Sequence, residues 1–385
     1  MARQPQHISD ATLKLILAPG LGPVTFRKLE KTFSTHDRIV GTTARELTQI
    51  EGIGETSAQS LRRAIDQAQP TAQREAMEEH DVRLIVIGDE DYPALLGAIP
   101  NAPKALWMRG ELTQEDRLAI AMVGSRKCTA YGRDQAGRLS AMLGDCGLTI
   151  VSGGAFGIDA ESHRGALRVN ARTIAVMGCG LARTYPSQHK ELFERIIDQG
   201  GALLSEFPMN TEPKPEHFPQ RNRVISGLSL GVLVVEAAKR SGALITARLA
   251  ADEHGREAMA IPGRVDSPAS AGCLLAIREG WAALVTNHAE VLQQLDASNQ
   301  LVRGALESAG HPEASSSASL FDNQLTDSQR KIVEVFTIDA VGESLVVEQI
   351  AARTQIPLSQ LQADLTLLQI RGRISKDYNG IRLRK

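Results

Sequence analysis

The sequence predicts an α/β protein with a mostly parallel sheet, because short apolar runs alternate with helix-length segments between residues 80 and 295. Most of these runs end in glycine, proline or an acid, which is where strands of such a sheet turn into loops. Near-continuous apolar strands joined by helices are typical of a doubly wound sheet covered on both faces. The expected strands are RLIVIG, LAIAMVG, LTIVSGG, TIAVMGCG, ALLSEF, LGVLVVEA, EAMAIPG and WAALVT.

The glycine-rich ends of these runs should meet along one edge of the sheet. Right-handed crossovers between parallel strands place the carboxyl ends of the strands, with the loops that follow them, on the same side. Residues 80–295 are therefore interpreted as an extended Rossmann-like core with a ligand edge.

Residues 1–75 are predicted to form a separate helical domain. They contain two similar glycine turns, PGLGPVTFRKL and EGIGETSAQSL, each followed by a helix-compatible run. The turns resemble a pair of helix-hairpin-helix units of the SAM-like type, in which N–H groups at a helix start can hold a phosphate. The alternative is a helical adaptor whose glycines only permit tight turns.

The chain after the core divides into two further segments. Residues 296–324 lack periodicity and are rich in Ser and Ala, which predicts a flexible linker. In residues 325–385, Thr326 is a candidate N-cap for the first of the helical runs, which end in a short hairpin with Asn379–Gly380 as its turn. Helices followed by a β-ribbon are the layout of a winged helix.

Composition limits the classes of function. The 385 residues carry a formal net charge of −2, so any nucleic acid must be held by local positive charge. The polar N-terminus shows no secretory signal, and no apolar run is long enough for a membrane span. Four widely spaced cysteines without a CxxC pair indicate a reducing compartment, so we expect a cytoplasmic protein. The cysteines are Cys128, Cys146, Cys179 and Cys273.

Three glycine loops at the predicted edge are suited to anions. VGSRKCTAYG carries Gly124, Ser125 and Arg126, which combine close backbone approach, a hydroxyl donor and a planar cation. SGGAFGIDAESH carries Gly153, Gly154 and Phe156 before a helix start, where successive N–H groups form an anion nest. Asp159 in the same run should stabilise that helix through its dipole. MGCGLARTYP repeats the device with Gly178 and Gly180.

The run KPEHFPQRNRVISGLS is the most informative segment. Lys214, Phe218, Arg221, Asn222 and Arg223 combine cations and an aromatic at a predicted helix start, which suits a phosphate chain with a base stacked on the ring. The alternative makes Phe218 a core residue, and makes the two arginines structural clamps to acids such as Glu206 and Glu236.

A further turn lies in VVEAAKRSGALITARLAADEHG. Lys239, Arg240 and Ser241 precede a helix, where Ser241 can cap the helix or hold an anion. Glu236 at the strand end could be a catalytic carboxylate, but pairing with an arginine is the preferred interpretation.

Several chemistries are disfavoured. The phosphate-binding pattern GxxxxGK[ST] is absent, and the glycine loops depart from the GxGxxG of dinucleotide enzymes, so no cofactor is expected. The histidines show no zinc or triad arrangement, so no metal is expected either. Those inspected are His163, His189, His217 and His254.

Taken together, these motifs resemble the DNA-processing protein A (DprA/Smf) family. The resemblance rests on VGSR at 123–126, SGGAFGID at 152–159, SEFP at 205–208, FPQRNRVISGLS at 218–229, RSGALITARLA at 240–250 and AIPG at 260–263. Their order and spacing match over nearly the whole chain. One departure is GCLLAIREGWA, where Leu274 and Trp281 stand at positions that the family pattern fills differently.

The resemblance implies a recombination mediator that is not an enzyme. Members of this family bind single-stranded DNA in a positive pocket at the sheet edge, protect strands taken up in natural transformation, help load the RecA recombinase and dimerise through the core. Carried over to this chain, the resemblance points to Arg126 in the first loop, Gly153 and Gly154 in the second, and Lys214, Phe218, Arg221 and Asn222 around the third run. Lys239 and Arg240 precede the matched SGxLIT turn.

The sequence leaves two alternative functions open. A hydrolase related to the nucleoside-monophosphate phosphoribohydrolases would use Glu236 or Glu206 as its acid, although the PGGxGTxxE loop of that group is missing. A transcription regulator with a ligand-sensing core would use the basic tail of the C-terminal segment to contact duplex DNA.

Overall fold

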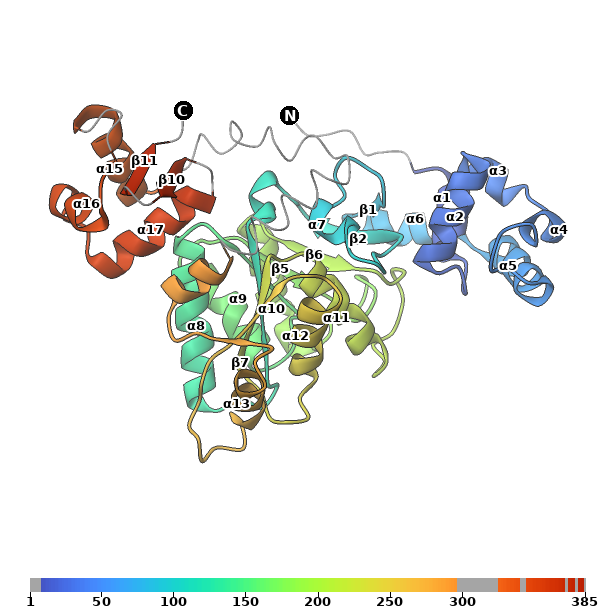
Figure 1. The fold of residues 1–385 in the computed structure, drawn as a ribbon. Coiled ribbons are helices and arrows are strands. Elements are labelled where there is room, and N and C mark those ends of the chain that lie inside the picture. The colour runs from blue at the N-terminus through green and yellow to red at the C-terminus, as the bar shows by residue number, and fades with distance from the viewer. Residues whose placement is uncertain (1–7, 296–324, 340–343, 371–372, 378–379, 384–385) are drawn as a thin grey trace.

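The computed structural model describes residues 8–295, 325–339, 344–370, 373–377 and 380–383 (Figure 1). The predicted linker, residues 296–324, lies outside these residues. The core contains the mostly parallel sheet that the apolar runs predict, and all eight expected strands are present.

The sheet has nine strands in the order β1-β2-β6-β5-β4-β3-β7-β8-β9. All pairs from β6 to β9 are parallel, whereas β2 pairs antiparallel with both β1 and β6. The strands are β1 (Val82–Val86), β2 (Ala105–Gly110), β3 (Ala119–Gly124), β4 (Thr149–Ser152), β5 (Thr173–Val176), β6 (Ala202–Ser205), β7 (Gly231–Glu236), β8 (Glu257–Ala260) and β9 (Ala283–Leu284).

Strand β2 is the strand that the sequence pattern missed. Its run ALWMRG follows Pro103 and Lys104 and ends at Gly110, so it carries flanking turn signals, but it was not among the predicted strands. Four of its six residues are nevertheless buried, because β2 lies between β1 and β6 and has both edges paired.

Helices cover both faces of the sheet. Alternate residues of β3 separate the two layers: Ala119, Ala121 and Val123 belong to one apolar cluster, whereas Ile120 and Met122 belong to another. The first cluster includes residues of α7 (Ala94–Gly97), α11 (His217–Gly227), α12 (Gly242–Asp252) and α13 (Ala271–Arg278). The second includes residues of α8 (Ala130–Asp145) and α9 (Ile158–Arg168), and α10 (Lys190–Asp198) packs beside α9.

The N-terminal helices share an apolar core with the antiparallel end of the sheet. Phe26 and Leu29 are buried in the same cluster as Leu84 of β1 and Trp107 of β2. These helices lie at the end of the molecule beside β1 and β2 (Figure 1). They are α1 (Asp10–Leu17), α2 (Pro23–Phe33), α3 (His36–Val40), α4 (Ala44–Leu47), α5 (Glu55–Gln67) and α6 (Pro70–Glu79).

Both predicted glycine turns precede helices. Gly22 is the N-cap of α2 and Gly54 is the N-cap of α5, and neither N-cap has a side chain that could satisfy the first N–H groups. Gly20 and Gly52 have φ values of +80° and +89°, which favour glycine.

The C-terminal segment contains three α-helices and a two-stranded antiparallel sheet. Thr326 caps the first helix as expected, since its hydroxyl accepts from the N–H of Gln329 at 3.2 Å. Gly380 pairs with Asp377 inside the ribbon, so it is the first residue of a strand and not part of the turn, and Asn379 lies outside the described residues. The elements are α15 (Asp327–Glu334), a π-helical stretch (Val335–Asp339), α16 (Val347–Thr354), α17 (Leu358–Ile370), β10 (Ile374–Asp377) and β11 (Gly380–Leu383).

This segment contacts the core through α17. Leu367 is fully buried in the same cluster as Leu139 and Leu143 of α8. In Figure 1, α17 lies above α8, at the opposite end of the molecule from the N-terminal helices.

Candidate nucleic-acid interface

A cavity of about 900 Å³ opens at the edge where β3, β4 and β7 end. The turn before α8, the loop before α9, the start of α11 and the start of α12 all contribute to its wall. Its lining includes Gly124, Ser125, Arg126, Lys127, Ala155, Tyr185, Phe218, Asn222, Arg240, Ser241 and Ile245. The sheet edge therefore gathers the loops that the sequence singled out.

The loop after β3 is held rigidly by its backbone. The N–H of Ser125 donates to the carbonyl of Glu236 at 2.7 Å, and the carbonyl of Ser125 accepts from the N–H of Ile158 at 3.2 Å. Gly157 makes this second contact possible: a Cβ there would lie 2.2 Å from the Ser125 carbonyl oxygen. The hydroxyl of Ser125 accepts from the N–H of Lys127 at 3.1 Å, so it closes its own turn.

Arg126 is exposed beside this turn and lies over an aromatic ring. Its guanidinium carbon is 4.9 Å from the centroid of the Phe218 ring. Among the described residues no acid forms an ion pair with Arg126, so its charge is available at the mouth of the cavity.

Phe218 is half-buried at the start of α11 and lines the cavity. Gly178 admits its ring, because a Cβ at that position would lie 2.7 Å from the ring. The ring of Tyr185 lies beside it, with centroids 5.6 Å apart and an interplanar angle of 43°. Phe218 thus belongs to an aromatic wall of the cavity and not to the interior of the sheet.

Arg221 lies deeper than the sequence suggested. It is 3% exposed, and its Nη1 donates to the carbonyl of Gly153 at 2.7 Å and to the carbonyl of Val176. Burial lowers its pKa to about 10, against the attraction of Asp159, so it is still a cation at neutral pH. Arg221 lines the cavity, and its Nη1 ties the ends of β4 and β5 together. These bonds favour a structural role, and its contact with phosphate stays a prediction.

The glycine loop after β4 also differs from an open anion nest. The carboxylate of Asp159 accepts from the N–H of Ala155 at 3.3 Å, so a side chain of the protein already occupies that donor. A Cβ at Gly153 would lie 2.6 Å from Asp159 and 2.7 Å from Arg221, and one at Gly154 would lie 2.9 Å from Phe193. The two glycines allow close packing and are not among the cavity lining.

Asp159 lies in the first turn of α9, where the sequence placed it. Burial raises the pKa of its carboxyl group, while Arg221 and the N–H of Ala155 act in the opposite direction. Its contacts are those of a residue that fixes a loop to a helix start.

Arg223 forms the structural clamp that the sequence offered as an alternative. Its Nη2 lies 2.5 Å from a carboxylate oxygen of Glu206, and the two side chains are 15% and 7% exposed. Burial raises the pKa of Glu206, and Arg223 opposes that rise. This ion pair favours the clamp interpretation, and contact of Arg223 with DNA stays a prediction.

Glu236 has a different partner from the one expected. Its carboxylate accepts from the N–H of Thr129 at 2.9 Å and from the hydroxyl of Thr129 at 2.5 Å. Thr129 is the N-cap of α8, so Glu236 joins the end of β7 to the start of that helix. The expectation that Glu236 pairs with an arginine is wrong.

The remaining predicted residues divide into two groups. Arg240 is exposed and lines the cavity, as does Ser241, whose hydroxyl caps α12 by accepting from the N–H of Ala243 at 3.3 Å. Lys214, Lys239 and Phe156 are exposed but outside the cavity lining. Phe156 packs edge-on against His189, with centroids 4.7 Å apart.

The chain matches one family model. The model of DNA recombination-mediator protein A covers residues 83–296, more than half of the chain. The chain belongs to the DNA recombination-mediator protein A family. This is the family that the loop motifs resemble, so the recognition from sequence is confirmed.

Named relatives cover most of the chain. Protein Smf of Escherichia coli is 38% identical over 312 residues, which is 80% of this chain and 79% of that protein. Protein Smf of Synechocystis is 32% identical over 378 residues, 93% of this chain and 94% of that protein. The X-ray structure of DNA processing protein A from Streptococcus pneumoniae superposes with a TM-score of 0.65 at 33% identity, covering 74% of this chain and 98% of that one.

Three side chains of the interface were not predicted from the sequence. They are Lys127 and Tyr185, which line the cavity, and Arg183, which is exposed two residues before Tyr185 in the loop after β5. In the run MGCGLARTYP only the glycines were predicted to matter. The sequence did contain a signal for this part of the interface: a cation and an aromatic residue lie two positions apart in a loop at the predicted ligand edge.

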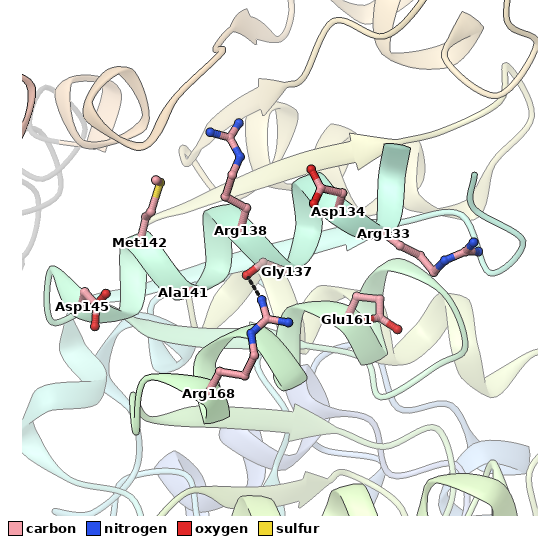
Figure 2. A pocket seen from close by; sticks show the side chains of 9 residues that line it. All are labelled: Arg133, Asp134, Gly137, Arg138, Ala141, Met142, Asp145, Glu161 and Arg168. Atoms are coloured by element: carbon pink, nitrogen blue, oxygen red, sulfur yellow. Dashed lines mark hydrogen bonds between the residues drawn. The ribbon is translucent and has the colours of Figure 1, made fainter. Parts of the chain in front are cut away.

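A second hollow, of about 630 Å³, lies over α8 and α9 and shares no lining residue with the first. Figure 2 shows Arg133, Arg138 and Arg168 in its wall beside Asp134, Asp145 and Glu161. Arg168 donates to the carbonyl of Gly137 at 2.8 Å. Equal numbers of cations and acids leave this hollow without the excess of positive charge that a phosphate chain requires.

Among the residues that the structure describes, no helix has both the length and the apolar character to cross a bilayer. Within the same residues, His, Cys, Asp and Glu side chains form no group of three that could hold a metal ion.

Proposed function

We propose that the chain binds single-stranded DNA at this cavity and acts as a recombination mediator without catalysing a reaction. The observation that carries the proposal is the pairing of Arg126 with Phe218: an unneutralised guanidinium lies over an aromatic ring of the cavity wall, 4.9 Å from its centroid. Lys127 and Arg240 are further exposed cations in the lining of the cavity.

The combination favours a strand over a free nucleotide or a duplex. Cations along a groove hold successive phosphates, and a base can stack on an aromatic ring only when it is unpaired. The sequence lacks the GxxxxGK[ST] loop that binds the terminal phosphates of a nucleotide. The name of the Streptococcus pneumoniae relative, DNA processing protein A, supports DNA as the ligand.

The absence of catalysis is part of the proposal. The two acids that a hydrolase could use are both engaged: Glu236 accepts two hydrogen bonds from Thr129, and Glu206 is paired with Arg223. Neither carboxylate is presented to the cavity as a free acid or base.

The family supports the wider role that we propose: protection of incoming strands in natural transformation and help in loading RecA, as a homodimer in the cytoplasm. We further propose that the chain is divided into four parts. They are a helix-hairpin-helix-like domain (1–75), the DNA-binding core (80–295), a linker (296–324) and a winged helix (325–385). The uncapped starts of α2 and α5 support the first, and the helices and ribbon of the C-terminal segment support the last.

The test compares the effects of substituting Arg126 and Phe218 on single-strand binding. Arg126→Ala should weaken single-strand binding and make the dependence of log affinity on log salt shallower by about 0.7 per lost phosphate contact. Phe218→Ala should weaken binding by roughly tenfold through lost stacking with little change in that slope.

Arg138→Ala is the matched control, because Arg138 is exposed on α8 outside the cavity. Its affinity and salt slope should equal those of the unmodified chain. If Arg126→Ala and Phe218→Ala bind as tightly as Arg138→Ala, the cavity is not the DNA site.

A further inference from the structure

We propose that a bound strand continues from the main cavity into a neighbouring hollow, where Tyr185 stacks on a second base and Arg183 binds the adjoining phosphate. The inference rests on the proposed function and extends the site by a subsite. Its basis is the position of Tyr185 between two hollows that both open at the loop after β5.

The two hollows share a wall. The smaller one, of about 530 Å³, is lined by residues 182–185 together with Glu212 and Pro213. Tyr185 and Pro213 also line the main cavity. A chain leaving the main cavity at this point therefore passes directly over the Tyr185 ring.

Tyr185 is available for stacking. Its side chain is 41% exposed although it is large and aromatic. Its ring is tilted by 43° to that of Phe218, with centroids 5.6 Å apart. Two rings at this spacing and tilt present separate faces, so each can receive a different base.

The charge of the second hollow also suits a strand. Arg183 is exposed in its wall, and no ion pair to Arg183 is found among the described residues. Glu212 is the acid in the same wall, which disfavours a phosphate beside it. The phosphate should therefore lie on the Arg183 side, with the polar edge of a base toward Glu212.

The rings of Phe218 and Tyr185 differ in whether a cation covers them. In this structure the guanidinium of Arg126 covers the Phe218 ring, whereas no cation lies over Tyr185 among the described residues. A base that stacks on Phe218 must displace Arg126, while a base on Tyr185 meets an open ring. The second subsite is thus ready to accept a base.

The experiment uses the full chain and oligothymidylates from about 4 to about 16 nucleotides, the range of site sizes for single-strand binders. Tyr185→Ala, Tyr185→Phe and Arg183→Ala are compared with the unmodified chain and with Arg138→Ala. Affinity is measured by fluorescence anisotropy at several salt concentrations.

We expect Tyr185→Ala to weaken binding of the longer oligonucleotides roughly tenfold beyond any loss that it causes for the shortest ones. Tyr185→Phe should bind the longer oligonucleotides as tightly as the unmodified chain because the aromatic ring is kept. Arg183→Ala should reduce the salt slope by about 0.7 for the longer oligonucleotides alone.

Two results would overturn the subsite. Equal affinity of Tyr185→Ala and the unmodified chain at every length would show that the ring binds no base. Equal weakening at every length would show that Tyr185 only supports Phe218. With either result, the main cavity is still supported as the DNA site if Arg126→Ala weakens binding. Failure of the subsite is therefore distinguishable from failure of the proposed function.

Discussion

At the scale of single residues, burial separates the arginines of this edge into different roles. Arg126 is exposed beside an aromatic ring, whereas Arg221 is buried and bonded to two backbone carbonyls. Arg223 is neutralised by Glu206. A guanidinium with five donors can serve either a ligand or the fold, and its surroundings decide which.

Arg221→Met should therefore destabilise the protein. The change leaves the Gly153 and Val176 carbonyls without their donor and leaves Asp159 without the opposing charge. We expect the free energy of unfolding to fall by about 3–5 kcal/mol, as for other broken buried charge interactions.

Denaturant unfolding monitored by circular dichroism measures this change. Arg126→Ala is the matched variant and should alter the unfolding free energy by less than about 0.5 kcal/mol, as is usual for an exposed side chain. Comparable stability of the two variants would contradict the structural role of Arg221.

The sequence predicted which residues gather at this edge better than what each one does. Chain order and strand pattern were sufficient to bring Arg126, Phe218, Asn222 and Arg240 into one cavity, since the carboxyl ends of parallel strands share an edge. How deeply each of these side chains is buried was not predictable, because burial depends on which backbone carbonyl each side chain reaches in the folded protein. Glu236 illustrates the point: its partner, Thr129, is 107 residues away in the chain.

At the scale of elements, Lys104 connects the N-terminal helices to the sheet. It precedes β2, and its Nζ donates to the carbonyls of Leu15 and Ile16 at 3.1 Å each, in the last turn of α1. Its Nζ also lies 6.0 Å from the Phe26 ring centroid. Burial lowers the pKa of this lysine from 10.5 to about 8.

This lowered pKa predicts a stability that rises with pH. Between pH 8 and 10.5 the unfolded chain holds the proton of Lys104 more tightly than the folded chain, so raising the pH favours the folded state. Below pH 8 both states are protonated and the contribution is constant.

Unfolding free energies of the unmodified chain and of Lys104→Met, measured from pH 7 to 11, check this. The difference between the two should shift in favour of the unmodified chain as the pH rises through that window. A difference that does not change with pH would mean that the lysine is as well solvated in the folded protein as in the unfolded one.

Element types were predictable from pattern where the pattern was strong. Every run with flanking turn signals became a strand, and the G-x-G turns precede helices as expected. Strand β2 carries such signals in Pro103 and Gly110 but was not predicted, and the structure defines it by its pairing with β1 and β6. Such tertiary pairing overrides local preference and is not visible in a single sequence.

At the scale of the whole molecule, the formal net charge of −2 limits how DNA can be held. The overall field does not attract a polyanion, so affinity must come from a few unneutralised cations at one edge together with aromatic rings. Several other arginines near this edge are neutralised or buried, and the hollow over α8 and α9 is balanced in charge.

The most direct test of this account is a comparison of three ligands with the unmodified chain: a labelled single strand, the duplex of the same sequence and free mononucleotides, each at several salt concentrations. The account predicts that the strand binds more tightly than the duplex, with an affinity that falls as salt rises, and that mononucleotides bind weakly and are recovered intact. Tight binding or hydrolysis of a mononucleotide, lost in Glu236→Gln, would contradict it, and so would a preference for the duplex.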